Sequence, residues 1–267
     1  NLSSLKEFRL YLLNNFCLLN CIDLGSNAFK NINGEKTNVV LAVFTKKESR
    51  FAKTLSSFGN LRSLPLSEKI DAIKTGDYSI YNIDIEEFRR NNNFEFNYQL
   101  VEDLQLIDKY SKYGDYAKCM QGRSTGNNQT MVKYIWEIDT PEWKLASKGG
   151  GFSKWEGLNY YKVKWGENGE LIKNQQGGVL RNPKEIPFTQ LVFSDTGTLG
   201  LNVRIKLQDQ VFIASGPGIK VLKGDVLCHL AFLNSKLASY FMKIINPKFT
   251  ISGGYIQKLP VARGILE

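Results

Sequence analysis

Short runs of aromatic and β-branched residues beyond Tyr116 constrain the fold of this 267-residue chain more than any other feature. Gly, Asn and Pro separate these runs, and this spacing predicts a mostly antiparallel β domain. The predicted strands are residues 132–138, 160–165, 191–193, 201–205 and 210–214. A helix is expected to begin at Gly224-Asp225 and to end before Asn246-Pro247. Its apolar face would consist of Val226, Leu230, Leu233, Leu237, Phe241 and Ile244.

The first 47 residues follow a different pattern. An amphipathic helix is predicted over residues 5–15, a short buried strand over 17–24, and a second buried strand over 39–44. A doubly wound sheet needs helices on both of its faces, and one helix with two strands cannot form one. The rest of this sheet is therefore expected in a segment that precedes the chain, which begins with Asn1 and not with Met.

The segment between these two parts is polar and mixed, and we interpret it as a helical or irregular connector. Residues 67–74 are predicted to form a capped helix, residues 83–90 are amphipathic, and residues 91–93 are predicted to form a turn. Residues 94–98 are expected to pair weakly. Residues 101–113 are expected to form the helix that leads into the second domain.

The positive charge of the chain is concentrated in its second part. The formal net charge is +9, and residues 113–267 carry 20 basic and 12 acidic side chains, whereas residues 1–112 carry 15 and 14. Such an excess favours a polyanionic partner, for example nucleic acid or an anionic surface.

Several classes of protein are disfavoured by the residue types present. The longest apolar stretch, residues 11–22, contains three asparagines and is shorter than the roughly 20 apolar residues that span a bilayer, so neither a membrane span nor a signal peptide is predicted. Cys17, Cys21, Cys119 and Cys228 lack metal-ligand spacing. Neither a metal site nor a disulfide framework is predicted, and a reducing cytoplasm is the expected compartment.

No catalytic residue is predicted in this chain. Its single histidine, His229, lies among apolar helical residues, which favours a packed side chain over a catalytic one. Glu86 and Glu87 are adjacent on a polar helix face and do not converge on one point. The run of Gly149, Gly150 and Gly151 is too short for a dinucleotide-binding fingerprint. A close backbone approach to a ligand and a flexible hairpin tip explain these glycines equally well.

Two segments have a composition that suits nucleic acid. The first interleaves aromatic residues with lysines, which is typical of contacts with phosphates and exposed bases. It contains Trp143, Lys144, Lys148, Lys154, Trp155, Tyr160, Tyr161, Lys162, Lys164 and Trp165. A half-buried strand would show the same alternation, so both interpretations stay open. The second segment, residues 121–129, is rich in polar side chains, and from composition alone an ordinary surface loop is the simpler explanation.

Together these segments resemble adenine-specific DNA methyltransferases of the large single-chain restriction-modification kind, and most closely those of BREX phage-defence systems. The strings RLYLLNNF (residues 9–16), IDLG (22–25) and NVVLAVF (38–44) look like the last strands of their catalytic domain. The strings GRSTGNN (122–128) and YIWEI (134–138) look like the entry into their target recognition domain.

The most specific match is KGGGFSKW, residues 148–155, followed by NYY at 159–161. The strings LNSK (233–236) and IQKLPV (256–261), with Asn246-Pro247 between them, are similar to a closing pattern that these enzymes share with specificity subunits of type I restriction systems.

The chain also departs from the family pattern. The catalytic loop of the family has Asn-Pro-Pro followed by an aromatic residue, whereas Asn182-Pro183 is followed here by Lys184 and Asn246-Pro247 by Lys248. The glycine-rich S-adenosylmethionine loop and a nuclease signature are not recognisable either. The resemblance therefore implies that S-adenosylmethionine is the cofactor of a parent enzyme, that this chain binds no cofactor, and that it does not methylate DNA alone.

The resemblance implies an α/β plus mixed α+β fold in three parts. Residues 1–47 would be the edge of a Rossmann-like methyltransferase sheet, residues 48–112 the connector, and residues 113–267 a mostly antiparallel target recognition domain with a C-terminal helix. The implied partners are double-stranded DNA, the upstream catalytic domain of the same polypeptide and other restriction or phage-defence subunits, in a bacterial or archaeal cytoplasm. The candidate DNA-binding residues are Arg123, Ser124, Thr125, Asn127, Asn128, Gln129, Lys148, Gly149, Gly150, Gly151, Lys154 and Trp155.

Two alternatives stay open. A type I specificity subunit without a catalytic domain shares the closing pattern, but residues 5–44 look like methyltransferase strands. A non-enzymatic module that binds protein, carbohydrate or RNA through its aromatic and glycine-rich face also fits the composition.

Overall fold

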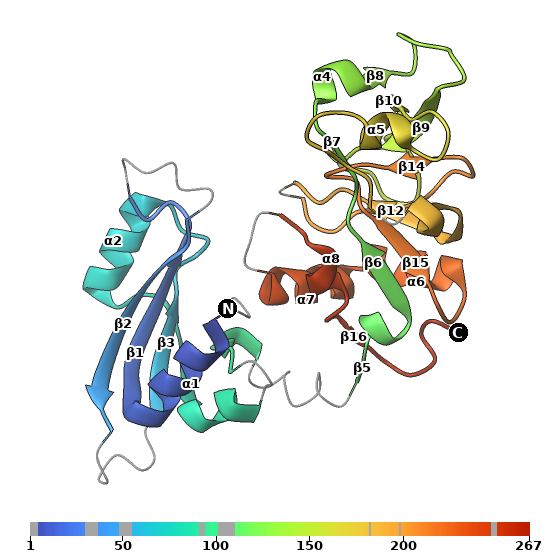
Figure 1. Cartoon of the computed structure of the whole chain (residues 1–267). Helices are drawn as coiled ribbons and strands as arrows, with labels where there is room; N and C mark the ends of the chain where they lie inside the picture. The colour runs from blue at the N-terminus through green and yellow to red at the C-terminus, as the bar shows by residue number, and fades with distance from the viewer. Residues whose placement is uncertain are drawn as a thin grey trace. The chain divides into compact units, whose positions relative to one another are not determined.

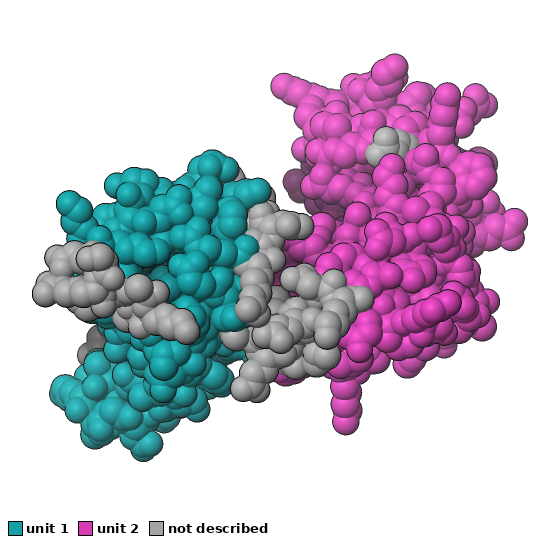
Figure 2. All heavy atoms as spheres, turned by 90° about the horizontal axis from the view of Figure 1, so that it is seen from below, with its two compact units in different colours: residues 1–106 teal, residues 107–267 magenta. Residues whose placement is uncertain are grey.

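The computed structural model describes residues 5–29, 37–47, 55–90, 94–100, 110–181, 183–197, 199–246 and 250–267. The chain divides into two compact units, Asn1–Leu106 and Ile107–Glu267, which Figure 2 shows in different colours. We refer to them as unit 1 and unit 2 and describe each by itself. Among the described residues, no helix has the length and apolar character needed to cross a lipid bilayer.

Unit 1 is built on a four-stranded sheet with the order β2-β1-β3-β4 (Figure 1). Its strands are β1 (Phe16–Gly25), β2 (Val39–Lys46), β3 (Leu55–Asn60) and β4 (Ser79–Asp84). Strand β1 runs parallel to β3 and antiparallel to β2, and β4 runs antiparallel to β3. Helix α1 (Lys6–Asn15) precedes β1, and helix α2 (Leu66–Thr75) lies between β3 and β4 in the chain.

Aromatic side chains dominate the core of unit 1. Phe58 of β3 stacks on Tyr98 with ring centroids 5.3 Å apart and meets Phe88 edge-on at 5.5 Å. Phe88 and Tyr98 come from two 3-10 helices, η3 (Ile85–Arg90) and η4 (Tyr98–Leu100). The aliphatic members of the cluster are Leu13, Leu18, Ile83 and Ile85. Buried aromatic rings remove a large apolar area from water, so this cluster is a main source of stability for the unit.

Strand β2 is exposed, although burial was predicted for it. The helix over residues 5–15 and the strands over 17–24 and 39–44 are confirmed in position as α1, β1 and β2. However, Val40 and Val43 of β2 are each 56% exposed. The apolar composition of β2 suggested a buried strand, but β2 is the outermost strand of its sheet, and the described residues leave most of its side chains uncovered.

Residues 48–112 do not form a connector that is separate from the first 47 residues. Strands β3 and β4 belong to the same sheet as β1 and β2, so the boundary expected at residue 47 divides one compact unit. The helix predicted over residues 67–74 lies within α2, and residues 83–90 form the end of β4 and the helix η3. The sequences of β3 (LSSFGN) and β4 (SIYNID) are short and partly polar, and therefore neither was predicted as a strand.

Three other predictions concern the end of unit 1 and the segment after it. The turn at residues 91–93 and the helix over residues 101–109 lie outside the described residues. Residues 94–98 do not pair as a strand. The predicted helix does not extend to residue 113, because Ser111–Lys112 is a strand, β5, that pairs antiparallel with β16 (Pro260–Val261).

Unit 2 contains two four-stranded sheets and several short elements (Figure 1). The first sheet is antiparallel and has the order β13-β12-β15-β6. Its strands are β6 (Ala117–Met120), β12 (Leu191–Phe193), β13 (Val203–Ile205) and β15 (Gly218–Val221). Helices α6 (Val226–Asn234) and α7 (Lys236–Ile245) supply much of the apolar core that packs with this sheet, including Leu233 and Met242.

The second sheet has the order β14-β9-β10-β8. Its strands are β8 (Val132–Tyr134), β9 (Trp143–Ser147), β10 (Tyr161–Lys164) and β14 (Val211–Phe212), and only the β14-β9 pair is parallel. Ala146, Val163 and Trp165 form its core with residues of the short helices α4 (Asn128–Met131) and α5 (Glu170–Lys173). The remaining elements are the pair β7 (Ser124–Thr125) and β11 (Gly178–Val179), the 3-10 helices η5 (Tyr113–Asp115) and η6 (Pro183–Phe188), and α8 (Gly253–Ile256).

The mixed fold with several small sheets confirms the coarse prediction, and each of the five predicted runs contains a strand. The single predicted C-terminal helix is wrong, because it is divided into α6 and α7 at Ser235. Ser235 has an extended backbone, and its hydroxyl accepts a hydrogen bond from the Ala238 amide, as an N-cap does. The predicted ends are confirmed: Asp225 caps α6, and α7 stops before Asn246.

Candidate nucleic-acid interface

Arg123 is fully buried in unit 2, although a DNA contact was predicted for it. Its Nη1 donates a hydrogen bond to the Phe212 carbonyl oxygen at 3.2 Å, and the guanidinium carbon lies 4.3 Å from the centre of the Phe212 ring. Burial lowers the pKa of Arg123 to about 10, so the group is still charged at neutral pH. The guanidinium packs inside the protein and does not face solvent, so its position does not support the predicted contact.

The rest of the segment after Arg123 forms a tightly bonded turn. Ser124 and Thr125 make up β7, and the Thr125 hydroxyl donates to Oδ1 of Asn128 at 2.6 Å. The Asn127 side chain caps α4 by accepting hydrogen bonds from the amides of Gln129 and Thr130. These contacts account for the polar composition of the string TGNN. Asn127, Asn128 and Gln129 are nevertheless exposed, so they stay available to a partner.

The three consecutive glycines have different structural roles. A Cβ atom on Gly149 would lie 1.6 Å from the carbonyl oxygen of Ser215, so only glycine fits there. Gly150 and Gly151 have φ values of +95° and +78°, which favour glycine. Nothing lies within 4 Å of a Cβ built on Gly150, which leaves open space beside its backbone. The backbone at Gly150 is therefore accessible to close approach by a partner. At position 149, glycine is required by packing inside the protein.

Lys148 and Lys154 flank the glycines but make different contacts. The Lys148 ammonium lies 4.5 Å from the centre of the Tyr161 ring, a cation-π contact at a half-buried position. Lys154 donates to the carbonyl oxygen of Asn234 at 2.7 Å, at the last residue of α6. A cation at a helix C-terminus is favourable because carbonyl groups there carry partial negative charge. Lys154 thus supports α6, and Lys148 is the better placed of the two to meet a phosphate.

Trp155 is held in an unusual backbone conformation at the edge of the first sheet of unit 2. Its φ is +75°, which is rare for a bulky residue, and its amide and carbonyl bond to Val203 and Ile205 of β13 at 2.9 Å each. The side chain is 51% exposed and lines an open hollow with Asn159, Leu207 and other residues. A rigid backbone that presents a half-exposed indole is suited to contact with a partner.

Two buried cations of unit 2 are held by neutral hydrogen-bond acceptors. Nη1 of Arg204 donates to Asn202 Oδ1 at 2.6 Å and to Ser194 Oγ at 3.2 Å, and burial lowers its pKa to about 10. The Lys206 ammonium donates to the carbonyl oxygens of Leu207, Gln208 and Gln210. These acceptors carry no net charge, so the positive charges of Arg204 and Lys206 are not neutralised by them. The burial of Arg204 and Lys206 was not predicted, because an isolated basic residue in or beside a strand carries no sequence signal of burial.

An additional feature that the sequence did not predict is a stack of aromatic rings on the second sheet of unit 2. Trp136, Tyr134 and Tyr161 contribute the rings. Tyr161 belongs to the segment that interleaves aromatic residues with lysines, whereas Tyr134 and Trp136 belong to the string YIWEI. Neither pattern distinguished packed from exposed rings.

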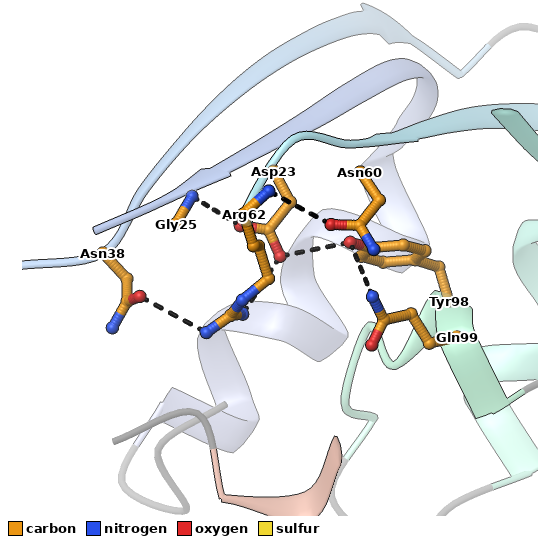
Figure 3. Close-up of polar contacts among 7 residues, drawn as sticks. All are labelled: Asp23, Gly25, Asn38, Asn60, Arg62, Tyr98 and Gln99. Carbon is orange, nitrogen blue, oxygen red and sulfur yellow. Dashed lines mark hydrogen bonds and ion pairs between the residues drawn. The ribbon is translucent and has the colours of Figure 1, made fainter. Parts of the chain in front are cut away.

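Unit 1 contains a cluster of polar residues that form hydrogen bonds and an ion pair with one another (Figure 3). Asp23 is almost buried near the end of β1 and accepts hydrogen bonds from the Gly25 amide at 3.0 Å, Arg62 Nη1 at 3.1 Å and the Tyr98 hydroxyl at 3.3 Å. Arg62 also donates to Asn38 Oδ1 at 3.3 Å. Burial and the Asp23 charge raise the pKa of Tyr98 well above its ordinary value. This cluster joins β1 to the segments that follow β3 and β4, so its role is to stabilise the fold of unit 1.

His229 is buried, as predicted from its apolar neighbours. Nδ1 lies 2.9 Å from the Tyr113 hydroxyl, and Nε2 lies 2.8 Å from the Lys223 carbonyl oxygen. Because a carbonyl only accepts, Nε2 carries the proton and Nδ1 accepts from Tyr113. Within the described part of the chain, no group of three or more His, Cys, Asp or Glu side chains could hold a metal ion.

Comparisons with known proteins connect this chain to DNA methyltransferases. No family model matches it. It is 22% identical over 292 residues to the adenine-specific methyltransferase PglX of Lacticaseibacillus casei (strain Zhang), and 24% identical over 279 residues to the adenine-specific methyltransferase BrxX of Escherichia coli O9:H4 (strain HS). Both alignments cover 98% of this chain but only 24% and 23% of the relatives, so the chain spans about a quarter of their length. The resemblance to BREX-type adenine-specific methyltransferases is thereby confirmed.

One solved structure shares the fold over most of the chain. It is the type IIL restriction-modification enzyme MmeI in complex with DNA, with a TM-score of 0.57 over 94% of this chain and 37% of that chain. The sequence identity is 9%, so the similarity concerns the fold alone.

Proposed function

We propose that this chain is part of a site-specific adenine N6 DNA methyltransferase of a phage-defence or restriction-modification system, and that unit 2 binds the target duplex. The observation that carries this proposal is the similarity to two adenine-specific methyltransferases along 98% of the chain. The motifs of the catalytic loop and of the cofactor loop are not recognisable in the sequence. Methylation is therefore assigned to the parent enzyme and not to this chain alone.

Unit 1 is proposed to be the edge of the Rossmann-like sheet of the catalytic domain. The outer edge of β2 pairs with no other described strand, and Val40, Leu41, Val43 and Phe44 are exposed on it. An exposed apolar edge strand tends to associate with another chain or strand. An upstream strand of the same polypeptide would satisfy the free backbone groups of β2 and cover these side chains. S-adenosylmethionine would bind to that upstream part.

Unit 2 is proposed to be the target recognition domain. Its excess of basic side chains suits a polyanion, and buried Arg204 adds a positive charge whose hydrogen-bond acceptors are neutral. Lysines would neutralise phosphates, whereas amide side chains can form hydrogen bonds to base edges in the major groove.

We propose that only some of the candidate residues contact DNA directly. Asn127, Asn128 and Gln129 are exposed on a rigid turn, and Lys148 and Trp155 present a cation and an indole. Gly150 leaves space for the DNA backbone. Other candidate residues are proposed to hold these groups in place, because each is buried, packed against backbone or bonded to another element. They are Arg123, Thr125, Gly149 and Lys154.

The test is fluorescence anisotropy of the whole chain with a random-sequence duplex across a salt series. The logarithm of the affinity is expected to fall linearly with the logarithm of the salt concentration. Lys148→Ala should weaken binding and reduce that slope by about 0.9, the value for one lost phosphate contact.

The matched control is Lys74→Ala, which removes the same charge from an exposed position on α2 in unit 1. It should leave the slope unchanged. Absence of salt-dependent binding at low salt would contradict the assignment of unit 2, and equal effects of the two variants would contradict the placement of the interface at Lys148.

A further inference from the structure

Three aromatic rings form a continuous stack on the second sheet of unit 2. Tyr134 of β8 and Tyr161 of β10 are cross-strand partners, and their ring centroids lie 5.0 Å apart with an interplanar angle of 27°. The Trp136 ring lies 4.5 Å from Tyr134 and is nearly parallel to it, at 7°. The Lys148 ammonium contacts the Tyr161 ring at 4.5 Å. We call Trp136, Tyr134 and Tyr161 the aromatic stack.

The backbone that carries the aromatic stack is fixed by hydrogen bonds. The Tyr134 amide donates to the Glu137 carboxylate at 2.6 Å, and the Glu137 amide donates to the Tyr134 carbonyl at 3.0 Å. The Ile135 amide donates to the Tyr160 carbonyl at 2.9 Å. Trp136 is therefore held in place by its neighbours before any partner arrives.

The outer end of the aromatic stack is open. Trp136 is 69% exposed and Tyr134 is 41% exposed. Flat stacking on Tyr134 occupies one face of the Trp136 indole, and most of the remaining surface of this side chain meets solvent. A large aromatic surface that is held rigid and left in water indicates a binding site. Lys148 contacts Tyr161, the ring on the other side of Tyr134 in the chain of contacts, and adds a positive charge to the aromatic stack. The ligand should therefore combine a flat ring with a negative group.

We propose that the aromatic stack binds an unstacked nucleobase of DNA, with Trp136 against the base and Lys148 near the adjacent phosphate. The inference rests on the proposed function, because it takes DNA as the partner of unit 2. Every nucleobase has a π-face, and stacking of bases on aromatic side chains is a recurrent way to hold nucleotides outside the duplex stack. The site serves binding and involves no covalent step, so it differs from a pocket in which a base is chemically modified.

The test compares two duplexes of the same length that differ in one extra, unpaired 2-aminopurine nucleotide, with anisotropy for affinity and 2-aminopurine fluorescence for stacking. The wild-type chain is expected to bind the duplex with the unpaired base about tenfold more tightly and to quench its fluorescence. Trp136→Ala should abolish both effects while it leaves binding of the fully paired duplex unchanged. Trp136→Phe should retain part of each.

The control variant is Leu227→Ala, which removes an equally exposed apolar side chain from α6 of the same unit. It should preserve the preference for the unpaired base. Equal binding of the two duplexes by the wild-type chain, or a preference that survives Trp136→Ala, would overturn this inference and leave the proposed function intact. Absence of binding to either duplex would overturn both, and tighter binding of single-stranded RNA of the same sequence would overturn the assignment to DNA.

Discussion

At the scale of single residues, the basic side chains of the segments proposed to bind DNA lie in two different environments. Lys148 is half-buried and keeps part of its side chain exposed, whereas Arg123 is fully buried against Phe212 and Trp165. A guanidinium has a flat, weakly hydrated face that can pack on aromatic rings, and its hydrogen bond to the Phe212 carbonyl offsets part of the cost of burial. The burial of each basic residue in a motif therefore has to be known before a contact with DNA is proposed for that residue.

Replacement of Arg123 should destabilise the fold. Arg123→Ala removes a buried side chain and its hydrogen bond to Phe212, so the free energy of unfolding should fall by about 3 kcal/mol. Urea unfolding followed by tryptophan fluorescence measures this. Arg263→Ala, which removes the same charge from an exposed position, should change stability by less than about 0.5 kcal/mol. Equal effects of the two variants would contradict a packing role for Arg123.

His229 should make the stability of the chain depend on pH. Burial lowers the pKa of His229 below its ordinary value, so the unfolded chain binds a proton that the folded chain does not. The free energy of unfolding should therefore fall as the pH falls below about 6.5, by up to about 1.4 kcal/mol per pH unit. Urea unfolding at several values between about pH 5.5 and 7.5 measures this slope.

The matched variant for that slope is His229→Gln. The chain contains one histidine, so the variant should be less stable than the wild type at neutral pH but should lose the dependence in this range. A slope that is the same in both proteins would show that other groups titrate there.

At the scale of elements, Ser235 divides the predicted C-terminal helix into two helices, α6 and α7. Its side chain accepts a hydrogen bond from the Ala238 amide, and its backbone is extended. Ser235→Ala should destabilise the chain by about 1 kcal/mol, because α7 loses its N-cap. Thermal unfolding measures this effect. Ser239→Ala, the same change inside α7, should leave the melting temperature within error of the wild type or raise it, and a larger loss for Ser239→Ala would contradict the capping role.

Elements with a strong local pattern were predictable from the sequence. Helix α1, the strand at residues 191–193, the N-cap at Asp225 and the end of α7 follow from periodicity, β-branched composition and capping residues. Strands β3 and β4 were missed because their pairing depends on partners far along the chain. The burial of Arg123 and the stacking of Trp136 on Tyr134 were missed for the same reason, since tertiary contacts decide which side of a strand or turn faces water.

At the scale of the whole molecule, the exposed face of β2 should make the isolated chain prone to self-association. Val43→Lys places a charge on this edge strand, and charged side chains on an edge oppose pairing between chains. Sedimentation velocity should show less association for Val43→Lys than for the wild type. Leu227→Lys, a matched change at an exposed position of α6, should leave association unchanged, and equal effects would contradict a special role for β2.

Unit 2 is proposed to determine which DNA sequence the parent enzyme modifies. The most direct measurement exchanges residues 110–267 in a full-length parent enzyme for the corresponding residues of a relative with another target, and then maps N6-methyladenine across the genome of a host that expresses each protein. The methylated sequence is predicted to follow the exchanged segment. Methylation of the original sequence by the exchanged protein would contradict the claim.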